Sequence, residues 1–247
     1  MIYCMSDIHG HYSGYKALLS KISFKSTDTL YVLGNVIDGK GSSSMKLLLD
    51  MMMRENVYPI IGDHEYAAIE CLSILMENAD DPNFKGLPKE KMEQMADWVS
   101  MGGDKTIKEF RALDDEKREM VVDYLSDFSL YEEVEIGSKK FVLVHAGINN
   151  FSPDKELDDY DIYELINDAP DYSKKYYDDK YLVTGHMPTR RIFESQYPLI
   201  GFTPEGESSP YDKVYMENNH IAINCGIDIG GRLCVVRLDD MSVFYAH

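Results

Sequence analysis

The chain has 247 residues, of which 44% are hydrophobic and 28% charged, a composition typical of a globular protein with one substantial core. The 43 acidic residues outnumber the 25 basic ones, and the formal net charge of −18 argues against duplex nucleic acid as a partner, because phosphate backbones are bound through excess lysine and arginine. No apolar run approaches the ~20 residues that span a bilayer and we identify no signal peptide, so we expect a cytoplasmic protein that does not contact a membrane.

The first 65 residues alternate short apolar runs with helical patterns. The apolar runs predict three buried strands, at residues 1–5, 29–33 and 57–61. The stretches between them predict two helices, at residues 12–22 and 43–55. A strand–helix–strand alternation of this kind is typical of an α/β protein with parallel strands.

The rest of the chain is predicted to add a helical segment and a second sheet. Residues 66–128 read as mainly helical, with a helix at 66–76 and breaks near 82–88 and at Gly102-Gly103. The following strands are predicted at residues 131–136, 140–144, 181–184, 221–224, 232–238 and 242–245, with a helix near 160–167. We therefore predict an α/β (mixed α+β) fold in which two packed mixed β-sheets are flanked by helices. Residues 1–247 would form one domain, with a mainly helical insert at about 66–128.

Side chains that can bind metal ions follow five of these strands. Each apolar run is followed by a small residue and then by a potential ligand. The blocks are Ser6-Asp7-Ile8-His9-Gly10, Gly34-Asn35-Val36-Ile37-Asp38, Gly62-Asp63-His64-Glu65, His145-Ala146-Gly147 and Gly185-His186. In open α/β sheets such loops meet beyond the carboxyl ends of the strands, so we expect the blocks to converge. Imidazole and carboxylate ligands together favour Mn, Fe or Zn, and five blocks indicate a two-metal hydrolytic centre.

These blocks make the chain similar to the calcineurin-like metallophosphoesterases of the phosphoprotein-phosphatase type. Within that superfamily it most resembles the bacterial symmetrical diadenosine-tetraphosphate hydrolases and the phage-type serine/threonine protein phosphatases. The resemblance extends to Trp98-Val-Ser-Met-Gly-Gly-Asp-Lys-Thr106, to Gly185-His186-Met187-Pro188-Thr189 and to the segment 225–233, so it covers nearly the whole chain.

The resemblance implies a role for each block. Asp7 and His9 would hold the first metal, position 35 would bridge both metals, and position 63 would hold the second metal together with His145 and His186. A bridging water activated by the two ions would attack phosphorus. His64 would protonate the leaving-group oxygen, and Asp38 would orient that imidazole.

Two departures from the family pattern bear on activity. The bridging position is Asn35, where the family has Asp, and Asp63 stands where the family has Asn, so one negative charge has moved between the metal sites. The family's phosphate-gripping Arg after Asp38 is replaced by Gly39, and a second family Arg aligns with Ala169. Lys40 and Arg190 are the candidate substrate-binding cations that remain, and restoring an arginine at Gly39 is expected to raise activity.

We therefore expect a metal-dependent phosphoesterase that hydrolyses a phosphomonoester of the phosphoserine or phosphothreonine type, or a dinucleoside polyphosphate, with altered or reduced activity. The alternative is a catalytically impaired pseudophosphatase that acts as a binding or regulatory protein. The histidines outside the blocks, His11, His220 and His247, are interpreted as ordinary surface or turn residues. Glu65 is interpreted as an acid favoured at a helix N-terminus.

Overall fold

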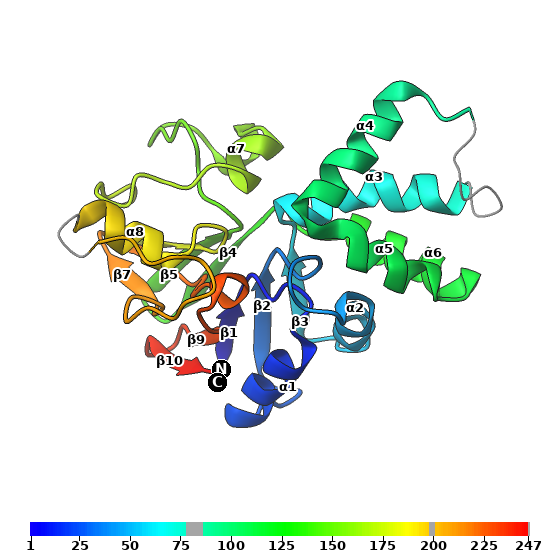
Figure 1. The fold of residues 1–247 in the computed structure, drawn as a ribbon. Helices are drawn as coiled ribbons and strands as arrows, with labels where there is room; N and C mark the ends of the chain where they lie inside the picture. The colour runs from blue at the N-terminus through cyan, green and yellow to red at the C-terminus, as the bar shows by residue number, and fades with distance from the viewer. Residues whose placement is uncertain (78–85, 198–200, 247) are drawn as a thin grey trace.

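Two five-stranded sheets pack against each other, with helices outside them (Figure 1). The computed structural model describes residues 1–77, 86–197 and 201–246. This arrangement confirms the predicted class of two mixed sheets flanked by helices. The first sheet has the strand order β10-β9-β1-β2-β3, with bounds Ser242–Tyr245, Cys234–Arg237, Ile2–Met5, Thr29–Leu33 and Val57–Ile60.

The second sheet repeats this plan with later segments of the chain. Its strand order is β4-β5-β6-β8-β7, with bounds Tyr131–Ile136, Lys139–Val144, Lys180–Thr184, His220–Ala222 and Tyr215–Glu217. Strands β1, β2 and β3 run parallel, as do β5, β6 and β8. The antiparallel strands β9 and β10 lie on one flank of the first sheet, whereas β4 and β7 lie on opposite flanks of the second. Within each parallel set the carboxyl ends lie at one edge, and the loops that leave it are the predicted ligand blocks.

One hydrophobic core lies between the two sheets. Buried apolar side chains from both sheets meet there, including Cys4, Leu33 and Ile60 from the first sheet and Phe141 and Val183 from the second. These residues alternate in sequence with side chains of the opposite face, which in the first sheet pack under helices α1 (Tyr12–Lys21) and α2 (Ser44–Met52). Both faces of the central strands are thus covered, which is why they read as continuous apolar runs.

Four helices, which follow β3 and precede β4 in the chain, form a group of their own at one side of the molecule (Figure 1). They are α3 (Asp63–Glu77), α4 (Lys89–Trp98), α5 (Asp104–Arg111) and α6 (Asp115–Ser126). A single turn of π-helix, Val99–Gly103, joins α4 to α5, and Gly102 there has a φ of 104°, which accounts for the predicted break. The other predicted break, near 82–88, lies mostly outside the described residues. Helices α7 (Ile162–Ile166) and α8 (Thr189–Gln196) flank the second sheet.

Several element boundaries differ from the sequence-based prediction. Helix α3 begins at Asp63, three residues before the predicted start, so a predicted metal ligand lies in the first helical turn. The segment predicted as a strand at 232–238 enters the sheet only at Cys234, because Gly226–Arg232 form a turn closed by backbone bonds such as Gly231 N–H to Gly226 O at 2.7 Å. In the described part of the chain, no helix has both the length and the apolar character needed to cross a membrane.

Candidate metal centre

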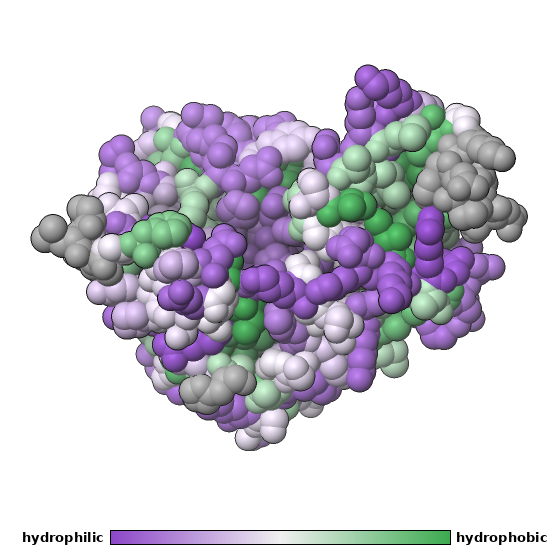
Figure 2. Space-filling model, in the orientation of Figure 1, coloured by the Kyte–Doolittle hydropathy of each residue, from purple (hydrophilic) through white to green (hydrophobic). Residues whose placement is uncertain are grey.

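The loops after the parallel strands meet where the two sheets adjoin. His145, after β5, donates from Nδ1 to the carbonyl oxygen of Leu33 at the end of β2, at 2.7 Å. The backbone N–H of His186, after β6, donates to Oδ2 of Asp7, after β1, at 2.9 Å. These two bonds tie the second sheet to the first at the site edge. The predicted convergence of the ligand blocks is therefore seen directly in the structure. On the surface, hydrophilic residues line a hollow between the part of the molecule that carries α7 and the part that carries α4 (Figure 2).

Asp63, His145 and His186 form the tightest cluster of potential metal ligands in the described residues. Their ligand atoms lie within 4.8 Å of one another. His145 Nε2 is 2.9 Å from Asp63 Oδ1, and His186 Nδ1 is 3.4 Å from the same oxygen. Because Nδ1 of His145 donates to Leu33, its Nε2 lone pair can face a cation, the usual arrangement for a metal-bound histidine. One carboxylate and two imidazoles suit Zn, Mn or Fe.

The charge of this cluster calls for a cation. Burial raises the pKa of Asp63, but hydrogen bonds from His145 and His186 outweigh it and hold that pKa well below its usual range. Burial lowers the pKa of His145, yet Asp63 and Asp7 raise it above its ordinary value. Asp63 is therefore ionised and draws positive charge onto the ring nitrogens that face it. A divalent ion would supply that charge in place of the proton.

Asp7, His9 and Asn35 form a second, looser group beside the first. His9 Nδ1 donates to the carbonyl oxygen of Ile37 at 3.3 Å, and its Nε2 lies 3.8 Å from Asp7 Oδ1. The Asn35 amide donates from Nδ2 to that same Asp7 oxygen at 3.2 Å, and its Oδ1 accepts from the backbone N–H of His64 at 3.4 Å. Asn35 lies between the two groups, where a bridging ligand would be needed. In this structure its amide nitrogen donates a hydrogen bond to the Asp7 carboxylate.

The ligand loops adopt strained backbone conformations. Five of these residues have left-handed φ angles of 46–65°, namely Asp7, His9, Asn35, Asp38 and His186. Each such non-glycine residue costs about 1–3 kcal/mol, and strain of this kind persists only where surrounding contacts over-determine it. The concentration of strained residues in the blocks indicates that surrounding contacts hold these loops in conformations that fix the positions of their side chains.

Glu65 supplies much of that restraint. It lies in the first turn of α3 and is fully buried. Its two carboxylate oxygens accept backbone N–H bonds from Asn35, Val36, Ile37 and Gly62, at 2.8–3.2 Å. The sequence-based interpretation of Glu65 as an acid favoured by the helix dipole was thus incomplete. Its carboxylate fixes the loop that carries Asn35.

His64 and Asp38 form the predicted acid–carboxylate pair. His64 Nδ1 donates to Asp38 Oδ2 at 2.9 Å, which leaves Nε2 available for a leaving group. Asp38 is fully buried and also accepts from the Trp98 indole at 2.8 Å and from the Thr106 hydroxyl at 2.6 Å. Burial lowers the pKa of His64, but the Asp38 hydrogen bond and the charges of Asp63 and Asp38 raise it to about 9. His64 therefore carries a proton at neutral pH, as a general acid requires.

The Gly39–Gly41 loop is contacted by a carboxylate, that of Asp228, which the sequence did not indicate. Both oxygens of Asp228 lie 2.9 Å from the backbone nitrogen of Lys40, which donates to them, and Oδ1 lies 3.1 Å from His11 Nε2. A β-carbon at Gly39, whose φ is +75°, would fall 2.3 Å from Asp228 Oδ2. The space that a side chain at position 39 would need is therefore taken up by Asp228.

Two further expectations, those for Arg190 and His220, need correction. Arg190 is fully buried and makes a bidentate pair with Asp212, at 2.6 and 2.7 Å, so it cannot reach a substrate in this conformation. His220 is 1% exposed and lies among tyrosine rings rather than at the surface. His11 is half-buried and paired with Asp228. His247 lies outside the described residues, and the Lys40 side chain is exposed.

Comparison with known proteins agrees with this geometry. The sequence profile described as calcineurin-like phosphoesterase matches residues 1–225. A bis(5'-nucleosyl)-tetraphosphatase (symmetrical) of Wigglesworthia glossinidia brevipalpis is 37% identical over 65 residues, covering 26% of this chain and 24% of the relative. Across five such curated relatives the match spans 23–37% of their length, well short of the whole proteins.

Two solved structures share the fold. One, a protein whose assignment as a diadenosine tetraphosphatase is provisional, has a TM-score of 0.61 at 17% identity, with 99% of this chain and 92% of that chain covered. The other is a protein serine/threonine phosphatase from Saccharomyces cerevisiae with similarity to human phosphatase PP5. It has a TM-score of 0.54 at 14% identity and covers 99% of this chain and 78% of that chain. At these identities the likeness concerns the fold alone.

Proposed function

We infer that this chain, which belongs to the calcineurin-like phosphoesterase family, is a working metal-dependent phosphoesterase with an altered first metal site. Its substrate would be a phosphate ester or a dinucleoside polyphosphate, the class named for the curated relatives. The pairing of His64 with a fully buried Asp38 carries the proposal. A protein that only binds a partner has no need of an imidazole held protonated at the mouth of a metal site.

The residues present fit two divalent ions unequally. Asp63, His145 and His186 would hold one ion, since their ligand atoms already converge. Asp7 and His9 would hold the other with the help of Asn35, whose neutral amide is a weaker bridge than a carboxylate. When bound, the ions supply an activated water and neutralise charge on the phosphate.

The protein's own groups would then carry the remaining chemistry. In the hydrolysis a water oxygen bonds to phosphorus and the bond from phosphorus to the leaving oxygen breaks. His64 Nε2 gives its proton to that leaving oxygen, while Asp38 stabilises the imidazolium until the step is complete. Lys40, whose side chain is exposed next to Gly39, is the candidate cation for binding the incoming phosphate. Trp98 and Thr106 hold the Asp38 carboxylate in position by donating hydrogen bonds to it.

The proposal is tested by Mn-dependent release of nitrophenolate from p-nitrophenyl phosphate and of adenine nucleotide from diadenosine tetraphosphate. The purified His64→Ala protein is the blank. We expect turnover of at least one substrate that needs Mn and falls by about 10²–10⁴-fold in the blank, the usual contribution of general acid catalysis. Equal rates in both proteins at the background level would refute the proposed activity.

One observation favours the rival function, a non-catalytic relative. The hydrogen bond from Asn35 to Asp7 satisfies both side chains without a metal ion, as it would in a site that has lost its first ion. Such a protein would still bind one Mn at Asp63, His145 and His186. Its signature would be a Mn-dependent rise in Tm with no turnover of either substrate.

A further inference from the structure

We propose that a cavity beside α1 is a second binding site of this protein, separate from the metal centre, for a small organic molecule that carries an oxyanion. The oxyanion would be a carboxylate or a phosphate, and it would bind to the guanidinium of Arg232. The described residues that line this cavity include none of the candidate metal ligands and neither His64 nor Asp38. The ligand is therefore distinct from the substrate, and its binding does not depend on catalysis.

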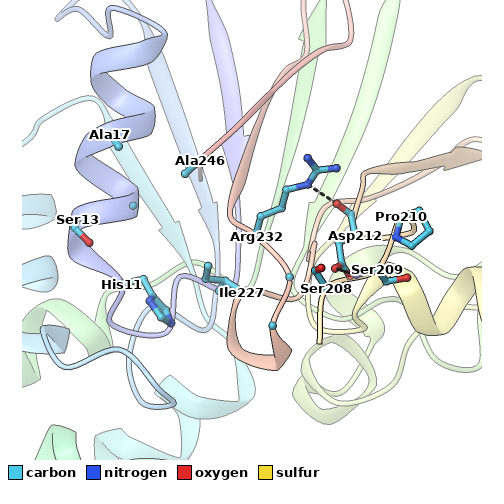
Figure 3. A pocket seen from close by; sticks show the side chains of 13 residues that line it. His11, Ser13, Ala17, Ser208, Ser209, Pro210, Asp212, Ile227, Arg232 and Ala246 are labelled. Carbon is cyan, nitrogen blue, oxygen red and sulfur yellow. Dashed lines mark hydrogen bonds between the residues drawn. The ribbon is translucent and has the colours of Figure 1, made fainter. Parts of the chain in front are cut away.

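Three segments of the chain border this cavity, which has a volume of about 740 Å³. They are residues 11–17 at the start of α1, residues 208–212, and residues 227–232 in the turn before β9. Figure 3 shows α1 on one side and residues 208–212 on the other, with Arg232 between them. Space remains between the segments because small residues form much of the wall, namely Ser13, Gly14, Ala17, Ser208, Ser209 and Ala246. Cavities of about 300–1,000 Å³ are those that hold small organic molecules in proteins.

The Arg232 side chain is held in a fixed orientation at the wall of this cavity. Its Nε donates to the carbonyl oxygen of Asp212 at 2.6 Å, and its guanidinium lies over the Tyr245 ring, 3.9 Å from the ring centre. Among the described residues, none accepts a hydrogen bond from Nη1 or Nη2 of this guanidinium. Two such nitrogen atoms match the geometry of a carboxylate or a phosphate, which accept two parallel hydrogen bonds. Arg232 is thus oriented to bind an anion.

The acid in the described lining of the cavity is already paired. This acid is Asp212, whose carboxylate is almost completely buried. Its two oxygens accept hydrogen bonds from Arg190 at 2.6 and 2.7 Å and from the backbone N–H of Ser209 at 2.7 Å. The first turn of α1, which forms the facing wall, contains no acidic residue. Although the protein has a net charge of −18, an anion that enters this cavity meets a cation, Arg232, and a carboxylate that is already neutralised.

The charge and the walls together define the class of ligand. A single guanidinium suits a group with one or two negative charges, whereas a polyanion would be repelled by the net charge of −18. Ala17 and Ile227 contribute apolar surface, and the exposed hydroxyls of Ser13 and Ser208 can donate further hydrogen bonds. We therefore expect a carboxylate or a phosphate attached to a compact apolar group.

The test measures binding of benzylphosphonate and phenylacetate by isothermal titration calorimetry. The two probes carry a phosphate analogue and a carboxylate on the same benzyl group, and neither is open to hydrolysis. The protein is first freed of metal ions with a chelator that is then dialysed away, so that no bound cation at the metal centre attracts the probes. Benzyl alcohol is the uncharged counterpart. We expect saturable binding of at least one anion and none of benzyl alcohol, and the tighter anion identifies the oxyanion that the site prefers.

Arg232→Gln should weaken this binding about tenfold or more, because the hydrogen bonds from a charged donor are lost. Arg237→Gln is the matched control, since Arg237 also lies over an aromatic ring, that of Phe244, but is not among the described residues that line the cavity. It should leave the affinity unchanged. Lys40→Gln tests the other location, because Lys40 is the exposed cation beside the metal centre.

Three results would overturn the proposal. One is the absence of saturable binding of both anions, and another is an equal affinity for benzyl alcohol. The third is binding that is lost in Lys40→Gln and unchanged in Arg232→Gln, which would place the anion at the metal centre.

If Arg232→Gln does not fold, Ala17→Phe still decides the question. Ala17 is exposed on α1 at the wall of the cavity, so a phenylalanine there can take up the space of the ligand without removing a buried contact. We expect Ala17→Phe to lose the binding of the anions. Wild-type affinity in Ala17→Phe would place the anion outside this cavity and would contradict the proposal.

Discussion

Replacing Asn35 by Asp should make the stability of the protein depend more strongly on metal ions. Both Asn35 and Asp7 are almost completely buried, and the Asn35 amide nitrogen lies 3.2 Å from Asp7 Oδ1. In Asn35→Asp a hydrogen bond becomes a contact between two carboxylates. Without a cation this contact is repulsive. With a bridging ion, a carboxylate at position 35 should bind the ion more strongly than the neutral Asn35 amide does.

The size of the effect follows from that distance. Two unit charges about 3.2 Å apart repel by about 5 kcal/mol at an effective dielectric constant near 20 and by about 1 kcal/mol in bulk water. Partial protonation of the pair limits the cost, so we expect about 2 kcal/mol. For a protein of this size, a loss of about 2 kcal/mol lowers Tm by roughly 4–8 °C.

The assay is thermal melting of wild type and Asn35→Asp with a chelator and with saturating Mn. We expect the variant to melt lower than wild type without metal and to gain more on Mn addition. Asn56→Asp is the matched control, since its amide donates to the carbonyl oxygens of Lys25 and Asp28, away from the site. It should lose stability by the same amount with and without Mn. An identical Mn response of wild type and Asn35→Asp would refute the bridging role of Asn35.

Three further outcomes follow from the contacts described above. Gly39→Arg, which the sequence alone led us to expect would raise activity, should instead lower Tm by the equivalent of about 1–3 kcal/mol and leave activity no higher, because its β-carbon would meet Asp228. Adding Asp228→Ala should recover part of the stability, and a stable, more active Gly39→Arg protein would contradict this expectation. Arg190→Met should lower the free energy of unfolding, measured in urea, by about 3–5 kcal/mol, because it leaves the Asp212 carboxylate buried without its partner. A loss below about 1 kcal/mol would show that the ion pair is dispensable for stability. Burial lowers the pKa of His220 below its ordinary value, and its buried Nδ1 has no hydrogen-bond partner. The stability of the protein should therefore fall as pH drops below about 6.5, because the unfolded chain takes up the proton more readily than the folded one. His220→Gln should reduce this dependence of Tm on pH, and an unchanged dependence would show that His220 is not its cause.

The sequence correctly predicted that the site loops follow buried strands, and there is a physical reason for this. Strands such as Thr29–Leu33 are covered on both faces, so they appear as apolar runs, and the ligand blocks follow them directly. Parallel strands then bring those blocks to one edge. The convergence of Asp63, His145 and His186 follows from local patterns and one topological rule.

The contacts that were missed join residues far apart in the chain. Asp228 meets the loop at Lys40 across 188 positions, and an acid in a glycine-rich turn has no local signal that marks such a partner. Arg190 read as a free cation because its pairing with Asp212 is a tertiary contact. Glu65 fixes the Asn35 loop from the first turn of α3, where the sequence suggests only a favourable helix start. Gly39 and Gly41 were the available hint, since paired glycines indicate close approach of another group.

The measurement that bears most directly on the proposed activity is Mn-dependent hydrolysis of bis(p-nitrophenyl) phosphate in ¹⁸O-labelled water. The product p-nitrophenyl phosphate is analysed by mass spectrometry for wild type and His64→Ala. We expect wild-type product to carry one labelled oxygen at each turnover, because water attacks phosphorus, and the His64→Ala protein to form almost none. Product without label, or equal labelled product from both proteins, would contradict a hydrolytic site in which His64 is the general acid.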